Sequence, residues 1–241
     1  MTNTFDTLIL VGRPASGKSE IIDYLLHLEE VERRRHFHLS GLDILDDFPM
    51  LWAWFEEDAL LEKKFHKPRL HTDRDGYFLH GDLWHLLIER LDLDFHKHRR
   101  DDPDYSQKHT SLLEFSRGIE HGGYAAAFSH FSDDLLDRAA VLYVQVSFEE
   151  SMRKNRLRFN PQRPDSILEH GLPDEKMERL YKDDDWESLT ASNPHFLQIR
   201  DVRIPYVVFN NDDDVTTNKP DQLASRLEDC LDRLWRLRNE K

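Results

Sequence analysis

The sequence predicts a single three-layer α/β domain over the whole chain of 241 residues, with a parallel five-stranded sheet between two layers of helices. Three observations lead to this prediction. Short apolar stretches alternate along the chain with segments of helical periodicity. The first of them, at 5–11, runs into a glycine-rich loop and then into a helical segment, as in a strand–loop–helix unit. The run at 139–146 is almost wholly apolar, which is typical of a parallel strand covered on both faces.

The charge of the chain limits its partners. Acidic residues number 47 and basic residues 33, the net charge is −14, and the basic residues form no long run. Such a surface repels nucleic acid and anionic membranes, so we expect neither as a partner. No apolar stretch is as long as a membrane span, and the apolar start is too short for a signal peptide. The single cysteine, Cys230, lies in an apolar stripe and suits a reducing compartment, so a cytoplasmic protein is expected.

The loop after the first strand runs from Gly12 to Ser19 and fits the Walker A pattern G-x-x-x-x-G-K-S/T. Its glycines let backbone N–H groups close around phosphate oxygens, and the following helix adds partial positive charge at its N-terminus. Lys18 is expected to face solvent in the empty loop and to reach the β- and γ-phosphates, while the Ser19 hydroxyl holds Mg²⁺. A tight glycine turn that caps a helix is the alternative. The expected nucleotide contacts are Gly12, Arg13, Pro14, Ala15, Ser16, Gly17, Lys18, Ser19 and Glu20.

A short second strand is predicted at 36–39, followed by a turn that holds Asp43, Asp46 and Asp47. Ligands of parallel α/β sheets bind beyond the carboxyl ends of the strands, so these carboxylates are expected near the reacting group. Asp43 is the first choice for a catalytic base that accepts a proton from a substrate hydroxyl. Helix capping by aspartates in a turn is the alternative.

Residues 48–109 are expected to form a helical insertion between the second and third strands. Apolar and aromatic residues at helical spacing predict two amphipathic helices, near 50–61 and 83–91, joined by a polar turn at 68–76. The insertion is a candidate wall for an acceptor pocket, with aromatic side chains that stack on a flat substrate. Ordinary core packing is the alternative. The histidines of this region lack the spacing of a zinc site.

The segment 109–118 predicts a third strand that runs into a loop, with Glu114 at the carboxyl end of the strand. Beside a phosphate loop, a carboxylate at this position is expected to hold Mg²⁺ directly or from the second shell. Arg117 follows three residues later and is expected to bind a phosphate or an anionic substrate. A Glu–Arg pair on the surface is the alternative.

The helix after the fourth strand begins with a capping box and carries a concentrated basic patch. We expect residues 150–190 to act as a lid whose arginines clamp the transferring phosphates. Arg153 and Arg156 share a helix face and are the expected catalytic pair, while Arg158 lies elsewhere on the surface. A solvated helix face is the alternative. The cations of the patch are Arg153, Lys154, Arg156, Arg158 and, beyond a proline, Arg163.

The fifth strand is predicted at 203–211 and ends in Asn210 and Asn211. Their amides lie at the carboxyl edge of the sheet, where they read an adenine edge or form a turn. A C-terminal helix from about 220 to 238 closes the fold.

The order of strands and helices, with the Walker A loop after the first strand, resembles the P-loop kinases of the nucleoside and nucleotide kinase group. The resemblance covers most of the chain in plan. It implies a P-loop NTPase fold with strand order 2-3-1-4-5, ATP and Mg²⁺ as cofactors, and metal contacts of Ser19 and Glu114. It also implies catalysis by Lys18, Asp43, Glu114, Arg117, Arg153 and Arg156, and nucleotide contacts of Arg158, Asn210 and Asn211. In one departure, Phe115 and Ser116 separate an acidic residue and an arginine that are usually adjacent in deoxynucleoside kinases.

The sequence therefore predicts ATP- and Mg²⁺-dependent phosphoryl transfer to a small molecule such as a nucleoside, a nucleotide or another metabolite. A nucleotide-gated regulator that hydrolyses ATP slowly and signals to a protein partner is a rival from another class. A structural protein with a vestigial loop is a third. A guanine-specific switch is disfavoured, because the residues 210–213 lack the lysine of the Asn-Lys-x-Asp motif. The acceptor and the oligomeric state, including a homo-oligomer, stay open.

Overall fold

The computed structural model describes residues 3–158, 162 and 171–240. Its centre is a six-stranded sheet in the order β2-β3-β1-β4-β6-β5. Neighbouring strands run parallel except β5 and β6, which are antiparallel. The strands are β1 (Thr7–Val11), β2 (Gly41–Asp46), β3 (His109–Phe115), β4 (Ala139–Gln145), β5 (Phe196–Ile199) and β6 (Val202–Asn210).

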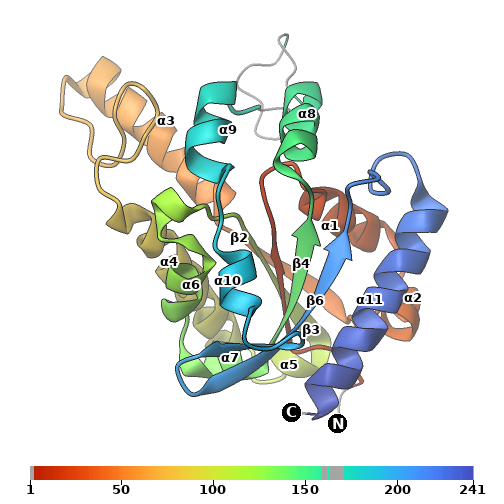
Figure 1. Ribbon diagram of the computed structural model, residues 1–241. Helices are drawn as coiled ribbons and strands as arrows, with labels where there is room; N and C mark the ends of the chain where they lie inside the picture. Colours follow the sequence, from red (N-terminus) through yellow and green to blue (C-terminus); the bar gives the residue numbers. More distant parts are fainter. Residues whose placement is uncertain (1–2, 159–161, 163–170, 241) are drawn as a thin grey trace.

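Helices cover both faces of the sheet, so the predicted three-layer α/β architecture is confirmed (Figure 1). On one face, apolar residues of α1 and α11 pack on a core that includes Leu10, Leu142 and Phe209. On the other face, residues of α4, α6, α7 and α10 pack on a core that includes Ile9, Leu113 and Val141. These helices are α1 (Lys18–His27), α4 (Asp82–Asp101), α6 (Gly123–Ser129), α7 (Asp133–Arg138), α10 (Trp186–Thr190) and α11 (Pro220–Glu240).

The prediction of five parallel strands is wrong by one strand. The order of the five parallel strands agrees with the predicted 2-3-1-4-5, and β5 is added at the edge next to β6. A tight turn joins the two strands, with Arg200 in the left-handed region at a φ of 50°. β5 is only four residues long, and its burial alternates as in a half-buried edge strand, so its periodicity is too short to stand out in the sequence.

The second strand begins later than predicted. Residues 36–39 do not form a strand, because α2 (Glu30–His36) extends to His36 and His38 has a left-handed φ of 54°. A strand requires a negative φ, so β2 starts only at Gly41. As a result, Asp43 lies in the middle of the strand, and Asp46 lies at its carboxyl end.

The insertion after β2 is helical, as predicted. It contains α3 (Phe48–Phe65), α4 and the short α5 (Tyr105–Lys108). The loop at 66–81 between α3 and α4 is organised by the buried Asp58 carboxylate. This carboxylate accepts hydrogen bonds from the backbone N–H groups of Leu70, His71 and Thr72 and from the Thr72 hydroxyl, at 2.6–2.9 Å. One aspartate of α3 therefore holds the backbone at 70–72.

The carboxyl ends of β4 and β6 point toward α8 (Phe148–Arg158) and α9 (Asp174–Tyr181), and the two termini lie at the opposite end of the molecule (Figure 1). α3 extends beside α9 at the same end. A 3₁₀ helix, η1 (Ile119–His121), follows β3. In the part of the chain that the structure describes, no helix is both long and apolar enough to cross a membrane.

Candidate active site

The Walker A loop connects β1 to α1 in a conformation that depends on its glycines. Gly12 and Gly17 have positive φ angles of 156° and 111°. A Cβ atom on Gly12 would lie 2.4 Å from the Val144 carbonyl oxygen, and one on Gly17 would lie 2.5 Å from the Asn211 amide nitrogen. Both positions therefore require glycine. Inside the loop, the Ser16 hydroxyl is buried and finds no hydrogen-bond partner among the described residues.

Lys18 does not face solvent in the empty loop, contrary to the expectation from the sequence. Its side chain is 5% exposed, and Nζ donates to the carbonyl oxygens of Gly12 and Arg13 at 3.1 and 3.0 Å and to Ser116 Oγ at 2.9 Å. Glu114 Oε1 lies 3.9 Å from Nζ. Burial lowers the pKa of Lys18, while the charge of Glu114 acts against this shift. Backbone oxygens of the loop and the Ser116 hydroxyl thus hold the ammonium group.

Two carboxylates lie side by side next to this loop. Asp46 and Glu114 are register partners at the carboxyl ends of β2 and β3, and Ser19 Oγ donates to Glu114 Oε1 at 3.2 Å. Burial and the charges of Glu114 and Asp47 raise the pKa of Asp46 to about 7. Burial also raises the pKa of Glu114, although the charge of Lys18 opposes it. The pair is an oxygen-rich, poorly solvated site that would be stabilised by an additional cation.

Arg117 forms the adjoining wall. Its side chain is 1% exposed, and Nη1 donates to Asp47 Oδ2 and to the Ser116 carbonyl oxygen, both at 2.7 Å. Nη2 donates to the Trp84 carbonyl oxygen at 3.0 Å, and Nε has no partner among the described residues. Removing one member of such a buried pair costs about 3–5 kcal/mol, so Arg117 first of all holds β2, β3 and α4 together.

A cavity of about 270 Å³ joins these groups at the N-terminus of α1. Asp46 belongs to its lining, and so do Trp84 and Tyr181, which sequence reasoning did not select. Gly12, Arg13 and Ser16 of the Walker A loop do not line it. The predicted site residues that it brings together are Pro14, Ala15, Gly17, Lys18, Ser19, Glu20, Glu114, Arg117 and Arg158.

Asp43 is not one of them. Its carboxylate accepts a hydrogen bond from the Tyr105 hydroxyl, and its Oδ2 lies 2.6 Å from His98 Nδ1. Side chains of a strand alternate between its faces, so Asp43 and Asp46, three positions apart, point to opposite faces of β2. Asp43 joins β2 to α4 and α5, and Asp46 occupies the position that the sequence analysis gave to Asp43.

The lid arginines are arranged differently from the prediction. The face of α8 that meets the Walker A loop is formed by Ser151, Asn155 and Arg158, at helical spacing. Ser151 Oγ donates to the Pro14 carbonyl oxygen at 2.7 Å, which fixes the rotation of the helix. Arg158 therefore lines the cavity, and its charge acts on both Lys18 and Glu114.

The predicted catalytic pair, Arg153 and Arg156, points away from the cavity. Arg153 pairs with Glu150 at 2.6 Å and Asp214 at 2.9 Å, and Arg156 pairs with Asp174 at 2.7 Å. Both are exposed. The solvated-face alternative thus describes these two residues. Arg163 and most of the segment between α8 and α9 lie outside the described residues.

Asn210 is the last residue of β6, and the side chains of Asn210 and Asn211 accept hydrogen bonds from the turn that follows the strand. Asn211 is fully buried, and its Nδ2 donates to the Ser16 carbonyl oxygen at 2.7 Å and to Thr216 Oγ1 at 2.8 Å. The exposed Asn210 accepts from the N–H group of Asp212.

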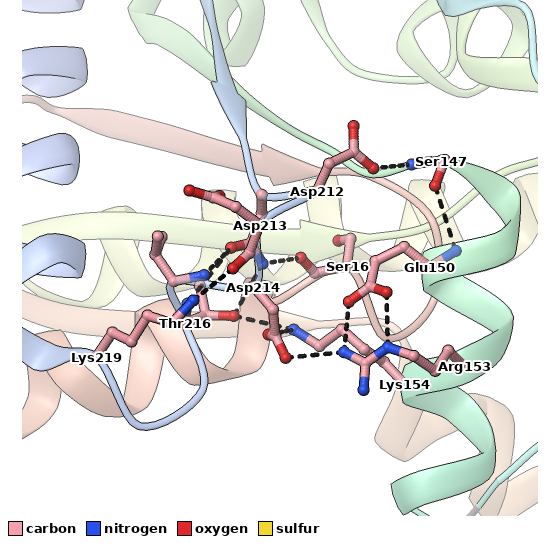
Figure 2. A network of polar contacts seen from close by, with 12 residues as sticks. Ser16, Ser147, Glu150, Arg153, Lys154, Asp212, Asp213, Asp214, Thr216 and Lys219 are labelled. Carbon is pink, nitrogen blue, oxygen red and sulfur yellow. Dashed lines mark hydrogen bonds and ion pairs between the residues drawn. The ribbon is translucent and has the colours of Figure 1, made fainter.

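The loop after β6 is tied to α8 as well as to the Walker A loop. Figure 2 shows Lys154 of α8 between Thr216 and Asp214, with Nζ distances of 3.0 and 2.8 Å. Lys154 is buried, and Asp214 also forms an ion pair with Arg153. This polar network contacts the Walker A loop through Asn211 and the Ser16 carbonyl oxygen. Lys154, Asp214 and Thr216 do not line the cavity.

Arg13, expected to contact the nucleotide, uses its side chain elsewhere. The guanidinium donates to the carbonyl oxygens of Tyr181, Val146 and Lys182 at 3.1–3.3 Å and pairs with Asp184 at 2.9 Å. It ties the Walker A loop to the end of α9, where Tyr181 lines the cavity.

No protein-family model matches the chain, and no curated protein matches its sequence. Among solved structures, the chain is similar to a sugar kinase from Janibacter sp. HTCC2649, with 14% identity and a TM-score of 0.41 over 97% of this chain and 98% of that one. It is also similar to shikimate kinase from Acinetobacter baumannii in complex with shikimate, with 15% identity and a TM-score of 0.41 over 93% of this chain and 92% of that one. Likeness of this degree says nothing about the acceptor or the reaction.

Proposed function

We propose that this protein transfers the γ-phosphoryl group of ATP to a hydroxyl group of a small molecule, with the help of Mg²⁺. One observation supports this proposal most strongly. A single cavity at the N-terminus of α1 collects most of the Walker A loop, two adjacent carboxylates and three cations, Lys18, Arg158 and the Asp47-paired Arg117. Phosphoryl transfer depends mainly on positioning and on neutralising charge, and these are the groups that supply both.

The triphosphate would lie along the Walker A loop. Loop N–H groups and the positive end of the α1 dipole suit phosphate oxygens. Lys18 Nζ would exchange its bonds to the loop carbonyl oxygens for bonds to the phosphates.

The site also fits a magnesium ion. Ser19 and Glu114 present hydroxyl and carboxylate oxygens, which Mg²⁺ prefers, and burial raises the pKa of Glu114, so a cation beside it would stabilise its ionised form. The described residues contain no group of three or more His, Cys, Asp or Glu side chains able to hold a metal ion. Phosphate oxygens and water would complete the coordination, as is usual for Mg²⁺. When bound, the ion would neutralise charge on the phosphates.

Asp46 is the proposed base. As the acceptor oxygen bonds to the γ-phosphorus and the bond to the ADP oxygen breaks, the hydroxyl proton passes to the Asp46 carboxylate. A pKa of about 7 suits a group that must accept a proton near neutral pH. Arg158 and Lys18 would stabilise the charge that develops on the transferring group.

The test is ADP release from Mg-ATP across a panel of metabolites that carry hydroxyl groups. We expect a subset to raise ADP release well above the rate without acceptor. Lys18→Met, which keeps the length of the side chain and removes its charge, should abolish that increase. ADP release that no acceptor changes would favour the nucleotide-gated regulator instead.

A further inference from the structure

We propose that the acceptor is a flat aromatic alcohol that carries an anionic group, and that its ring binds in a second cavity beside the first. The inference rests on the proposed function and deepens it by naming the class of acceptor. The second cavity has a volume of about 240 Å³. It shares Phe48, Leu51, Trp84, Leu172 and Tyr181 with the first cavity, so the two cavities adjoin, and the proposal places the hydroxyl group of the acceptor on the side of the carboxylates.

Aromatic rings line much of this second cavity. Phe55, Phe78, Trp84, His121 and Tyr181 form a continuous series, in which successive ring centroids lie 3.8–6.0 Å apart. The first three rings are only partly buried, although burial of aromatic surface is favourable. They come from α3, the loop at 66–81 and α4. A flat ring is the ligand shape that stacks on such walls.

His121 adds a hydrogen-bond donor to the apolar wall. It is 3% exposed, and its Nδ1 accepts from the N–H group of Gly118 at 3.1 Å. Burial and the nearby charge of Arg117 lower its pKa to about 3, so the ring is neutral and carries its proton on Nε2. This N–H group has no partner among the described residues. A ligand with an oxygen or nitrogen acceptor would satisfy it.

Lys176 adds a positive charge that forms no ion pair with a described carboxylate, although the charges of Asp73, Asp75 and Glu175 act on it. Its Nζ donates to the Gly76 carbonyl oxygen at 3.1 Å and lies 4.8 Å from the centre of the Tyr77 ring. None of the described carboxylates is within the ion-pair distance of 4.0 Å, whereas the neighbouring Arg179 pairs with Glu120 at 3.1 Å. Lys176 and His121 both line the cavity, which thus offers a positive charge and an N–H donor that suit an anionic group such as a carboxylate.

Binding of three small alcohols without nucleotide tests the inference. The probes are 4-(hydroxymethyl)benzoate, its saturated analogue 4-(hydroxymethyl)cyclohexanecarboxylate, and benzyl alcohol, which lacks the charge. Ligand-observed NMR titration gives each dissociation constant. We expect the benzoate to bind at least about tenfold more tightly than either of the others.

Two variants locate the binding. Lys176→Met should weaken the benzoate about tenfold and leave benzyl alcohol unchanged, and His121→Phe, which keeps a stacking ring, should weaken the benzoate less. Lys63→Met, an exposed lysine of α3 that does not line the cavity, is the matched control and should bind as the parent protein does. Equal affinity for the aromatic and the saturated acid would overturn the inference, as would unchanged affinity in both cavity variants.

Binding and turnover can fail separately. If the benzoate binds as expected and no acceptor raises ADP release, the proposed function fails while the ligand class stands. If only aliphatic acceptors raise ADP release and the benzoate does not bind, the ligand class fails while the kinase stands.

Discussion

Two aspartates three positions apart on β2 have different environments. Asp43 is held by Tyr105 and His98, far from the cavity lining, while Asp46 is register partner to Glu114 beside the Walker A loop. In the proposed reaction, the acceptor hydroxyl would therefore transfer its proton to Asp46 and not to Asp43.

The first prediction follows from this difference. Asp46→Asn should lower kcat by about 10²–10⁴ because it removes the base. Asp43→Asn, the matched control, should keep kcat near the parent value and lower the melting temperature, since it weakens the contacts of β2 with α4 and α5. Initial rates of ADP release and thermal unfolding measure the two effects. A lower kcat in Asp43→Asn, with kcat unchanged in Asp46→Asn, would identify Asp43 as the base.

The arginines of α8 give a second pair of variants. Arg158 lines the cavity, whereas Arg156 is exposed and paired with Asp174. Arg158→Ala should reduce kcat at least about tenfold, or 1.4 kcal/mol of transition-state stabilisation, with a smaller effect on KM for ATP. Arg156→Ala should leave both constants unchanged. A lower kcat in Arg156→Ala, with kcat unchanged in Arg158→Ala, would mean that α8 rotates before the reaction.

Among the elements, the loop at 66–81 contains a segment, 70–72, that is held by the buried Asp58 carboxylate. Burial would raise the pKa of Asp58, but the hydrogen bonds from Leu70, Thr72 and His71 outweigh it and lower the pKa from 3.8 to about 2. A depressed pKa means that the ionised group stabilises the fold at pH values above about 4. That contribution is lost as the pH falls toward 2.

We therefore expect Asp58→Asn to lower the free energy of unfolding at pH 7 by about 2 kcal/mol, from a shift of almost two pKa units. The difference from the parent protein should shrink between about pH 4 and pH 2. Chemical denaturation at a series of pH values measures it. Asp75→Asn, an exposed acid of the same loop, is the control and should cost much less. A difference that stays constant with pH would contradict this account of Asp58.

At the scale of the whole molecule, Arg13 connects the Walker A loop to the segment after α9. Its guanidinium donates hydrogen bonds to the carbonyl oxygens of Tyr181 and Lys182 and forms an ion pair with Asp184. Tyr181 lines both cavities. Arg13 therefore holds the segment that forms a wall shared by the two cavities.

Arg13→Gln should accordingly raise KM for the acceptor more than KM for ATP, because the backbone of the Walker A loop is kept while the cavity wall is released. Steady-state kinetics with each substrate varied in turn measure both constants. An equal rise in the two values would mean that Arg13 acts only through the loop.

Whether a feature could be predicted from the sequence depends on how far apart in the chain the residues that determine it lie. The Walker A loop and the helices of the insertion were predictable, because glycine spacing and apolar periodicity are local signals. The start of β2 was not, since it depends on the left-handed turn at His38. The orientation of α8 was missed because a distant contact, Ser151 with Pro14, sets it. The second cavity joins His121 and Lys176 from segments far apart in the sequence, which no local pattern indicates.

The fate of the γ-phosphoryl group tests the central proposal most directly. ³¹P NMR of the protein with Mg-ATP and an acceptor that raises ADP release follows every phosphorus atom at once. The account predicts a new phosphate ester of the acceptor in the same amount as ADP, with inorganic phosphate at background, and no ester in Lys18→Met. Inorganic phosphate in the same amount as ADP, with no ester formed, would contradict phosphoryl transfer and identify a nucleotide hydrolase.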